Sequence, residues 1–325
     1  MIPKKLKKGD HIRVISPAIT LAAIPEETQN MATARWQDMG FSVSFSQHAR
    51  EQNRFRSSSV ASRVSDLHEA FSDPAVDGIL TTLGGYNSNQ ILHHLDYELI
   101  RANPKVICGF SDITALSNAI YAKTGLVTYS GPHYSTLGMK KGVEYTIDMF
   151  KQCVMQEGVY RVEQADTWSD DMWFRDQEER TFIENEGYLL INEGEAGGTI
   201  LGGNLSTFPL LHGTPFMPSL KESILLLEDD DEAHLAAFDR LLQSIMHQPD
   251  FESVRGIVIG QFQKGSNVEE DALVETVKNK PELNHIPVIA RASFGHTTPQ
   301  FTFPIGGTGR LVANEKEVVF EIVTH

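Results

Sequence analysis

The sequence predicts an α/β fold in which a parallel sheet forms the N-terminal part of the chain. Short apolar runs alternate with helix-like stretches of roughly 10–15 residues, which is typical of βαβ units. Several of these stretches carry helix start and stop signals such as proline, serine or glycine at their ends. The chain has 325 residues, which exceeds a comfortable single core and predicts two domains.

The elements of the first domain follow in order. The apolar run 12–18 is a predicted strand, and a helix follows it with Pro25 near its start and Gly40 at its end. A helix opened by a serine cap is expected at 58–73. The remaining predicted strands are 41–46, 78–85, 105–110 and 126–132, and the remaining helices are 88–101 and 112–123. We assign residues 1–160 to this α/β domain.

The alternation breaks in residues 161–187. This segment is acidic, has no clean period, and carries Trp168, Trp173 and Phe174. Its aromatic residues argue against disorder, and long connections of this kind are usually functional when they are ordered. We expect a linker or lid between two domains, and an ordinary packed linker is the alternative.

Residues 188–325 form the second predicted domain. Its expected strands are 197–204, 223–229, 256–262 and 286–293, and its expected helices are 232–247 and 269–279. Two β-like runs separated by residues 313–316 predict a terminal hairpin.

Composition and charge exclude several classes of partner. The formal net charge of -15 is spread along the chain, so no basic face is available for nucleic acid or for an anionic membrane. The basic start MIPKKLKKGD is followed by no apolar run of signal-peptide or membrane-spanning length. Two cysteines, Cys108 and Cys153, do not make a disulfide framework. We therefore expect a cytoplasmic protein.

Ser111 lies where the strand 105–110 turns abruptly into a helix. In open α/β sheets, chemistry occurs beyond the carboxyl ends of the strands. A serine on such a turn can present its Oγ together with the amide of the next residue, Asp112, as a nucleophile elbow does. The sequence G-F-S-D does not match the generic G-x-S-x-G pattern, and a plain helix cap is the alternative.

A carboxylate and a histidine also follow predicted strands. Glu228 is the first residue of an acidic run after an apolar strand, and a hard-cation site is the rival interpretation of such a cluster. His296 lies in a Gly/Thr/Pro loop after a strand, and His133 competes with it from another strand end. Serine, carboxylate and histidine together make a chemically complete set for acyl transfer.

Gly84 and Gly85 follow the predicted strand that begins at residue 78. Glycines at this place let the backbone approach a substrate closely and supply a second oxyanion donor. A plain tight βα turn is the alternative. The sequence GGYNSN does not match G-x-G-x-x-G, so we expect no dinucleotide phosphate loop.

Five motifs in one order now point to a known family: TTLGGYNSNQ, CGFSDITAL, GGNLST, LLLED and SFGHTTP. With them, nearly the whole chain resembles the LD-carboxypeptidase family of serine peptidases. The resemblance implies a triad with Ser111 as nucleophile, Glu228 as carboxylate and His296 as base. It further implies an oxyanion hole made by the backbone amides of Gly85 and Asp112.

The resemblance also carries expectations for the whole protein. It implies a flavodoxin- or glutamine-amidotransferase-like α/β domain that carries the nucleophile, and a smaller β-rich domain that carries the glutamate and the histidine. It implies no cofactor and no metal. Members of the family are commonly homodimers, so we expect a homodimer that acts on a small peptide or an aminoacyl-nucleotide.

Two branches of the family compete for the substrate. Murein-trimming members remove terminal D-alanine from tetrapeptides in cell-wall recycling. Members similar to the microcin C self-immunity peptidase hydrolyse the amide between an aminoacyl group and a modified nucleotide. The long GGYNSNQ turn and the aromatic insertion favour the second branch, because aromatic rings stack on bases. We expect substrate contacts from Gly84, Tyr86, Trp173, Asn204 and Tyr188, although Tyr188 follows a motif near which the immunity proteins have a tryptophan.

Two other classes remain as alternatives. One is a binding module with the same fold and a disabled site, and the presence of all three triad residues argues against it. The other is a glutamine-amidotransferase-like enzyme, which would need a cysteine at the elbow. Cys108 lies three residues before Ser111, inside the predicted strand.

Overall fold

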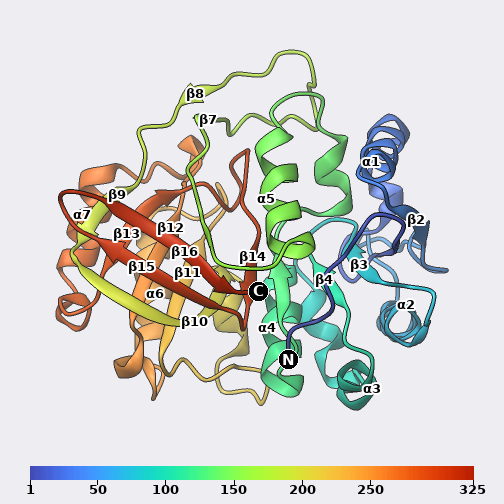
Figure 1. Cartoon of the computed structure of the whole chain (residues 1–325), viewed down its shortest axis with the longest axis horizontal. Coiled ribbons are helices and arrows are strands. Elements are labelled where there is room, and N and C mark those ends of the chain that lie inside the picture. Colours follow the sequence, from blue (N-terminus) through green and yellow to red (C-terminus); the bar gives the residue numbers. More distant parts are fainter.

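The computed structural model describes residues 1–325 and contains two large sheets that meet in the middle of the molecule, besides a small two-stranded sheet (Figure 1). Five strands of the first sheet are parallel and lie in the order β2-β1-β3-β4-β5. Their bounds are β1 His11–Ile15, β2 Ser42–Phe45, β3 Gly78–Thr81, β4 Val106–Cys108 and β5 Thr128–Ser130. This is the doubly wound order 2-1-3-4-5, and it confirms the predicted α/β class.

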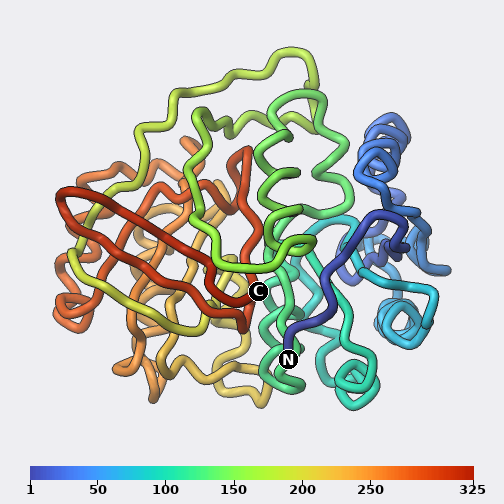
Figure 2. Tube along the Cα trace, in the orientation of Figure 1, coloured from blue at the N-terminus to red at the C-terminus, as the bar shows by residue number.

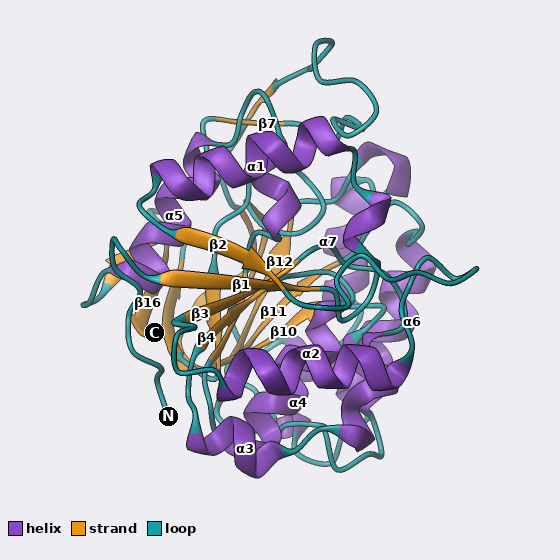
Figure 3. Cartoon of the chain, turned by 90° about the vertical axis from the view of Figure 1, so that its right-hand side faces the viewer, coloured by secondary structure: helices purple, strands orange, loops and turns teal.

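Helices cover both faces of this sheet. Figure 3 shows α1 and α5 on one side of the strands and α2, α3 and α4 on the other. The bounds are α1 Glu26–Asp38, α2 Val60–Ser72, α3 Tyr97–Ala102, α4 Ile113–Thr124 and α5 Glu144–Met155.

The single helix predicted over 88–101 is wrong. The chain forms a 3-10 helix over Ser88–His94 and then α3. Leu95 is extended, and the carboxylate of Asp96 accepts a hydrogen bond from the Leu99 amide as a new N-cap. A capping residue in mid-run therefore restarts the helix.

The second sheet has eight strands in the order β6-β16-β15-β10-β11-β12-β13-β9. Strands β10 to β13 are parallel, and the others pair antiparallel. The predicted terminal hairpin is confirmed as β15 and β16. The bounds are β6 Tyr160–Arg161, β9 Leu189–Asn192, β10 Gly194–Asn204, β11 Ser223–Glu228, β12 Gly256–Gly260, β13 Val288–Ala292, β15 Thr308–Ala313, β16 Val318–Thr324, α6 Leu235–Met246 and α7 Glu270–Lys278.

One strand from the C-terminal part of the chain joins the first sheet. Strand β14, Phe303–Ile305, pairs antiparallel with β5 at the edge of that sheet. The chain then returns to the second sheet in β15, so the two sheets are interlocked (Figure 2). The division into 1–160, 161–187 and 188–325 stays a prediction.

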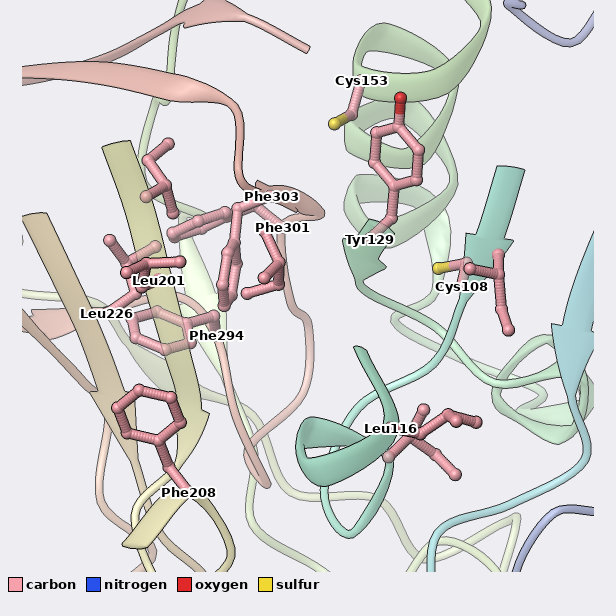
Figure 4. Close-up of a cluster of buried hydrophobic side chains, with 14 of the residues drawn as sticks. Cys108, Leu116, Tyr129, Cys153, Leu201, Phe208, Leu226, Phe294, Phe301 and Phe303 are labelled. Atoms are coloured by element: carbon pink, nitrogen blue, oxygen red, sulfur yellow. The ribbon is translucent and has the colours of Figure 1, made fainter. Parts of the chain in front are cut away.

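A single cluster of 80 buried apolar residues runs through both parts. Figure 4 shows Phe294, Phe301 and Phe303 packed together beside Leu201 of β10 and Leu226 of β11. The ring centroid of Phe294 lies 5.2 Å from that of Phe301 and 5.3 Å from that of Phe303. This aromatic cluster fixes the loop between β13 and β14, which carries His296.

The acidic, aromatic segment, residues 161–187, forms an arch at one end of the molecule (Figures 1 and 2). Its two short strands, β7 Thr167–Trp168 and β8 Ile183–Glu184, pair antiparallel. The backbones of Ser169 and Thr298 exchange two hydrogen bonds of 2.7 and 2.8 Å. The arch is therefore fastened to the loop that carries His296.

No helix has both the length and the apolar character needed to span a bilayer. Short 3-10 helices complete the chain. Besides Ser88–His94 they are Leu21–Ala23, Tyr134–Gly138, Phe208–Leu211, Phe251–Ser253, Lys264–Ser266 and Pro281–Leu283.

Candidate active site

Three side chains from distant parts of the sequence meet where the two sheets adjoin. Ser111 follows β4, Glu228 ends β11, and His296 follows β13. The distance from Ser111 Oγ to His296 Nε2 is 3.0 Å, and the distance from His296 Nδ1 to Glu228 Oε2 is 2.7 Å. The structure thus brings the three sequence-predicted residues into one hydrogen-bonded chain.

Ser111 has a left-handed backbone conformation, with a φ of 61°. This region is unfavourable for a residue with a Cβ and costs about 1–2 kcal/mol. Asp112 is the N-cap of α4, but its side chain makes no capping hydrogen bond. The Ser111 hydroxyl does not cap the helix either, because it is paired with His296 and not with a helix amide. The turn therefore aims the hydroxyl at the histidine, which a simple helix cap would not require.

Two glycines make room for the Glu228 carboxyl, which is 3% exposed. A Cβ on Gly295 would lie 2.6 Å from Glu228 Oε2, and a Cβ on Gly260 would lie 2.8 Å from Glu228 Cβ. The carboxylate accepts a hydrogen bond from Nδ1–H of His296 and orients the ring so that Nε2 faces the serine.

Two opposing effects act on the pKa of His296. Burial disfavours the imidazolium and lowers the pKa, but the adjacent Glu228 carboxylate, with Asp230 and Asp229 further away, stabilises the charged ring. The carboxylates dominate and raise the pKa of His296 to about 9. The histidine can therefore hold the proton that a serine nucleophile would give up.

The backbone N–H groups of Gly85 and Asp112 donate to no group in the protein. The Asp112 carboxylate accepts hydrogen bonds from the amides of Asn87 and Ser88, at 3.0 and 2.8 Å. This side chain ties the loop after β3 to the turn that carries Ser111. Both amides are thus free, and the loops that carry them are fixed relative to each other.

The loop after β3 passes very close to the nucleophile turn. A Cβ on Gly84 would lie 2.9 Å from Ser111 Cβ and 3.0 Å from Ser111 Oγ. Gly85 has a φ of 156°, and a Cβ there would lie 3.1 Å from side-chain carbons of both Ala18 and Ile19. Only glycine fits this approach without moving its neighbours.

A cavity of about 300 Å³ opens beside the triad. Phe110 and His296, which flank Ser111, form part of its wall. Met172, Trp173 and Phe174 of the arch line another part. A substrate bound at the triad would therefore touch the arch.

The five residues expected to contact the substrate differ in their position relative to the cavity. Trp173 lines the cavity and Gly84 lies against Ser111. Tyr86 is 58% exposed next to Gly85 but does not line the cavity. Asn204 and Tyr188 do not line it either.

Asn204 and Tyr188 have partners within the protein. The Asn204 side chain donates to Asp229 Oδ1 at 3.2 Å and accepts from the Thr207 hydroxyl at 2.8 Å. The Tyr188 hydroxyl donates to the carbonyl of Val162 at 3.0 Å, and its ring packs against the core. Neither side chain lines the cavity, and the expectation that both contact the substrate stays a prediction.

His133 also belongs to the site, although the sequence suggested it only as an alternative to His296. It lines the cavity, is 1% exposed, and packs its ring on Phe110 with centroids 4.4 Å apart. Its Nδ1 lies 2.7 Å from Thr81 Oγ1, and Nε2 has no partner. Burial, with the nearby His296, lowers the pKa of His133 to about 3, so the ring is neutral. Its position at a strand end was the available signal.

Known proteins are similar to this chain over most of its length. The LD-carboxypeptidase N-terminal domain matches residues 12–131, and the LD-carboxypeptidase C-terminal domain matches residues 197–311. The chain is 52% identical to the putative carboxypeptidase YocD of Bacillus subtilis over 96% of each protein.

Two solved structures are similar over essentially their whole length. A MccF-like protein from Bacillus anthracis is 57% identical, covers 100% of both chains, and superposes with a TM-score of 0.99. The microcin C7 self-immunity protein MccF in complex with aspartyl sulfamoyl adenosine is 27% identical, with a TM-score of 0.90 over 100% of this chain and 99% of that one. The chain belongs to the LD-carboxypeptidase family, a family of peptidases.

Proposed function

We propose that the protein is a serine amide hydrolase that cleaves the bond between an aminoacyl group and a modified nucleotide. The observation that carries the proposal is the hydrogen-bonded chain from Ser111 through His296 to Glu228. A hydroxyl is inert near neutral pH until a base takes its proton, and this chain supplies the base and its orienting carboxylate.

Acylation uses each of these groups once. Ser111 Oγ attacks the amide carbonyl carbon while its proton passes to His296 Nε2. The carbonyl oxygen becomes an oxyanion and accepts hydrogen bonds from the free amides of Gly85 and Asp112. His296 then gives its proton to the leaving nitrogen, the C–N bond breaks, and the acyl group stays on Ser111 as an ester.

Deacylation repeats the sequence with water. His296 takes a proton from a water molecule, whose oxygen attacks the ester carbonyl. The proton then passes to Ser111 Oγ as the C–O bond breaks, and the acid product leaves. The side chains of the triad supply every proton transfer, so this proposal requires no metal.

The choice of a nucleotide substrate rests on similarity and on the cavity. MccF, a structural neighbour, has been solved with aspartyl sulfamoyl adenosine. In this protein the arch brings Trp173 and Phe174 to the cavity wall, and stacking of a base on an aromatic ring is worth roughly 1–3 kcal/mol. The wall holds no lysine or arginine that could bind the free terminal carboxylate of a murein peptide.

Removal of D-alanine from a murein tetrapeptide is the competing reaction within the family. A single experiment separates the two. The protein and its Ser111→Ala variant are incubated with aminoacyl sulfamoyl adenosines that have acidic, neutral and basic side chains and with an L,D-linked murein tetrapeptide, and products are followed by mass spectrometry. We expect serine-dependent release of the sulfamoyl nucleoside. Serine-dependent loss of D-alanine alone would assign the protein to cell-wall recycling, and cleavage that survives in Ser111→Ala would refute the mechanism.

The proposal extends to assembly and location. We expect a homodimer that works in the cytoplasm, where both buried cysteines, Cys108 and Cys153, stay free thiols. Light scattering at micromolar concentration measures the assembly directly, and a monomeric mass would contradict it.

A further inference from the structure

The cavity beside the triad carries an unusual charge distribution. Five carboxylates line it, and no lysine or arginine does: Asp170, Asp171, Asp230, Asp231 and Glu232. Three of them are consecutive in the loop between β11 and α6, and the other two come from the arch. Carboxylates therefore reach the same cavity from two separate segments of the chain.

Most of this charge is not neutralised within the protein. Asp171 pairs with Arg180 at 2.6 Å. Asp170 accepts a hydrogen bond from the Lys264 amide, and Asp230 accepts one from the Glu232 amide. Asp170, Asp230, Asp231 and Glu232 make no ion pair, and the side chains of Asp231 and Glu232 make no hydrogen bond either. Four negative charges are thus available to a ligand.

Two buried polar atoms of the cavity wall are also without partners. They are His133 Nε2 and Thr297 Oγ1, on residues that are 1% and 4% exposed. The Thr81 hydroxyl donates to the carbonyl of Cys108 at 3.4 Å and accepts a hydrogen bond from Nδ1–H of His133 at 2.7 Å. His133 Nε2 then carries a bare lone pair. It lies on the Ser111 side of the ring, because a Cβ on Gly84 would be 3.5 Å from Nε2 and 3.0 Å from Ser111 Oγ.

These groups are matched to one kind of ligand. An ammonium or guanidinium group has several hydrogen-bond donors and no acceptor, whereas carboxylates and a bare imidazole nitrogen are acceptors. A carboxylate ligand would meet four like charges at short range. No three of the His, Cys, Asp and Glu side chains converge closely enough to hold a metal ion, which favours an organic cation.

We infer that the cavity selects an aminoacyl group whose side chain is cationic, such as a lysyl or arginyl group, and rejects an acidic one. This inference rests on the proposed function and names the substrate class for it. Asp231 and Glu232 are the specificity residues, since both are exposed in the loop between β11 and α6 and free of protein partners.

Binding and turnover test the inference separately. The Ser111→Ala variant, which cannot turn over, is titrated by calorimetry with lysyl, norleucyl and glutamyl sulfamoyl adenosine. Lysine and norleucine differ by the ammonium group and have side chains of similar shape. We expect lysyl to bind about tenfold tighter than norleucyl, as an ion pair of partial exposure allows, and glutamyl to bind weakest. The lysyl preference should fall as salt rises from 50 to 500 mM.

Variants locate the effect. In the Ser111→Ala background, Asp231→Asn with Glu232→Gln should reduce the lysyl preference to about twofold or less, and Glu232→Lys should shift the preference toward glutamyl. Glu282→Gln, an exposed acidic position outside the cavity, should change nothing. Equal binding of lysyl and norleucyl compounds, or a preference that survives the double substitution, would overturn the inference. Cationic selectivity in binding without hydrolysis by the intact protein would instead overturn the proposed function alone.

Discussion

Ser111 combines a backbone conformation that is unfavourable for serine with a hydroxyl that points at a histidine. The left-handed φ of 61° lets the residue leave β4 and enter α4 while its Oγ stays 3.0 Å from His296 Nε2. Such local strain is found at functional sites when the surrounding structure holds it in place. Here the Asp112 carboxylate holds the neighbouring loop through two amides.

Replacing Ser111 should separate stability from activity. Ser111→Ala and Ser111→Gly should both lose activity by a factor on the order of 10⁴ or more. Ser111→Gly should be about 1 kcal/mol more stable than Ser111→Ala, because alanine keeps the Cβ that makes positive φ unfavourable. Urea unfolding of the two variants measures the difference. A glycine variant less stable than the alanine variant would contradict the account of strain.

The pH dependence of kcat/KM should report the pKa of His296. The pKa of His296 is about 9, and only the neutral fraction of the imidazole acts as a base, so kcat/KM should rise about tenfold per pH unit up to that pH and then level off. Asp230→Asn removes one of the carboxylates that raise the pKa, so the rising limb should move to lower pH. Glu282→Gln is the control, and a limb that does not move with Asp230→Asn would refute the assigned cause.

Individual residues differ in how far sequence could place them. Ser111, Glu228 and His296 each end or follow a strand, and strand ends of a parallel arrangement gather at one edge. Tyr188 shows the limit, because its aromatic character fits a stacking role while its hydroxyl is paired with Val162 in the fold. The same holds for Asn204, whose partner Asp229 is distant in sequence.

At the scale of elements, the arch and the histidine loop form one unit. Ser169 and Thr298 connect them through two backbone hydrogen bonds. Arg180 holds the arch together: it pairs with Asp171, donates to the carbonyl of Lys141 at 2.9 Å, and packs on the ring of Phe182. The sequence of this segment has no regular hydrophobic period, and in the structure only the two short strands β7 and β8 form within it.

Loss of Arg180 should loosen the arch more than the triad. Arg180→Ala leaves Asp171 without its ion pair, so we expect KM to rise about tenfold with a smaller change in kcat. Cleavage of the arch by chymotrypsin, which does not cut after arginine, should also become faster. Arg175→Ala, at an exposed position in the same segment, is the matched control. Equal effects of the two substitutions would show that Arg180 is not the anchor.

Sequence patterns predicted most elements because each carries its own start and stop signals. They did not predict the break before Asp96, where one side-chain hydrogen bond to the Leu99 amide restarts the helix. They also did not predict β14, whose pairing with β5 depends on two segments far apart in the chain. Local signals determine elements, and nonlocal contacts determine how they join.

The whole molecule is one packed body despite its two sheets. The buried cluster is continuous, and Asn118 of α4 donates to the carbonyl of Gly202 in β10 at 2.8 Å. Because Ser111 follows a strand of one sheet, whereas Glu228 ends and His296 follows strands of the other, their hydrogen-bonded chain exists only while both sheets stay together.

Unfolding should therefore be cooperative. Urea titrations followed by far-ultraviolet circular dichroism and by tryptophan fluorescence should give coincident midpoints. Asn118→Ala should lower the free energy of unfolding by about 1–3 kcal/mol, since it leaves a buried carbonyl unpaired, while the two midpoints stay together. Two separated transitions would contradict the single-body description.

The central claim is that Ser111 forms a covalent acyl intermediate. The most direct measurement is rapid-quench intact-protein mass spectrometry with aminoacyl sulfamoyl adenosine, followed by peptide mapping. The account predicts one adduct with the mass of the aminoacyl group, on the peptide that contains Ser111, and none in Ser111→Ala. Turnover without any adduct on that peptide, at a rate unchanged in Ser111→Ala, would contradict it.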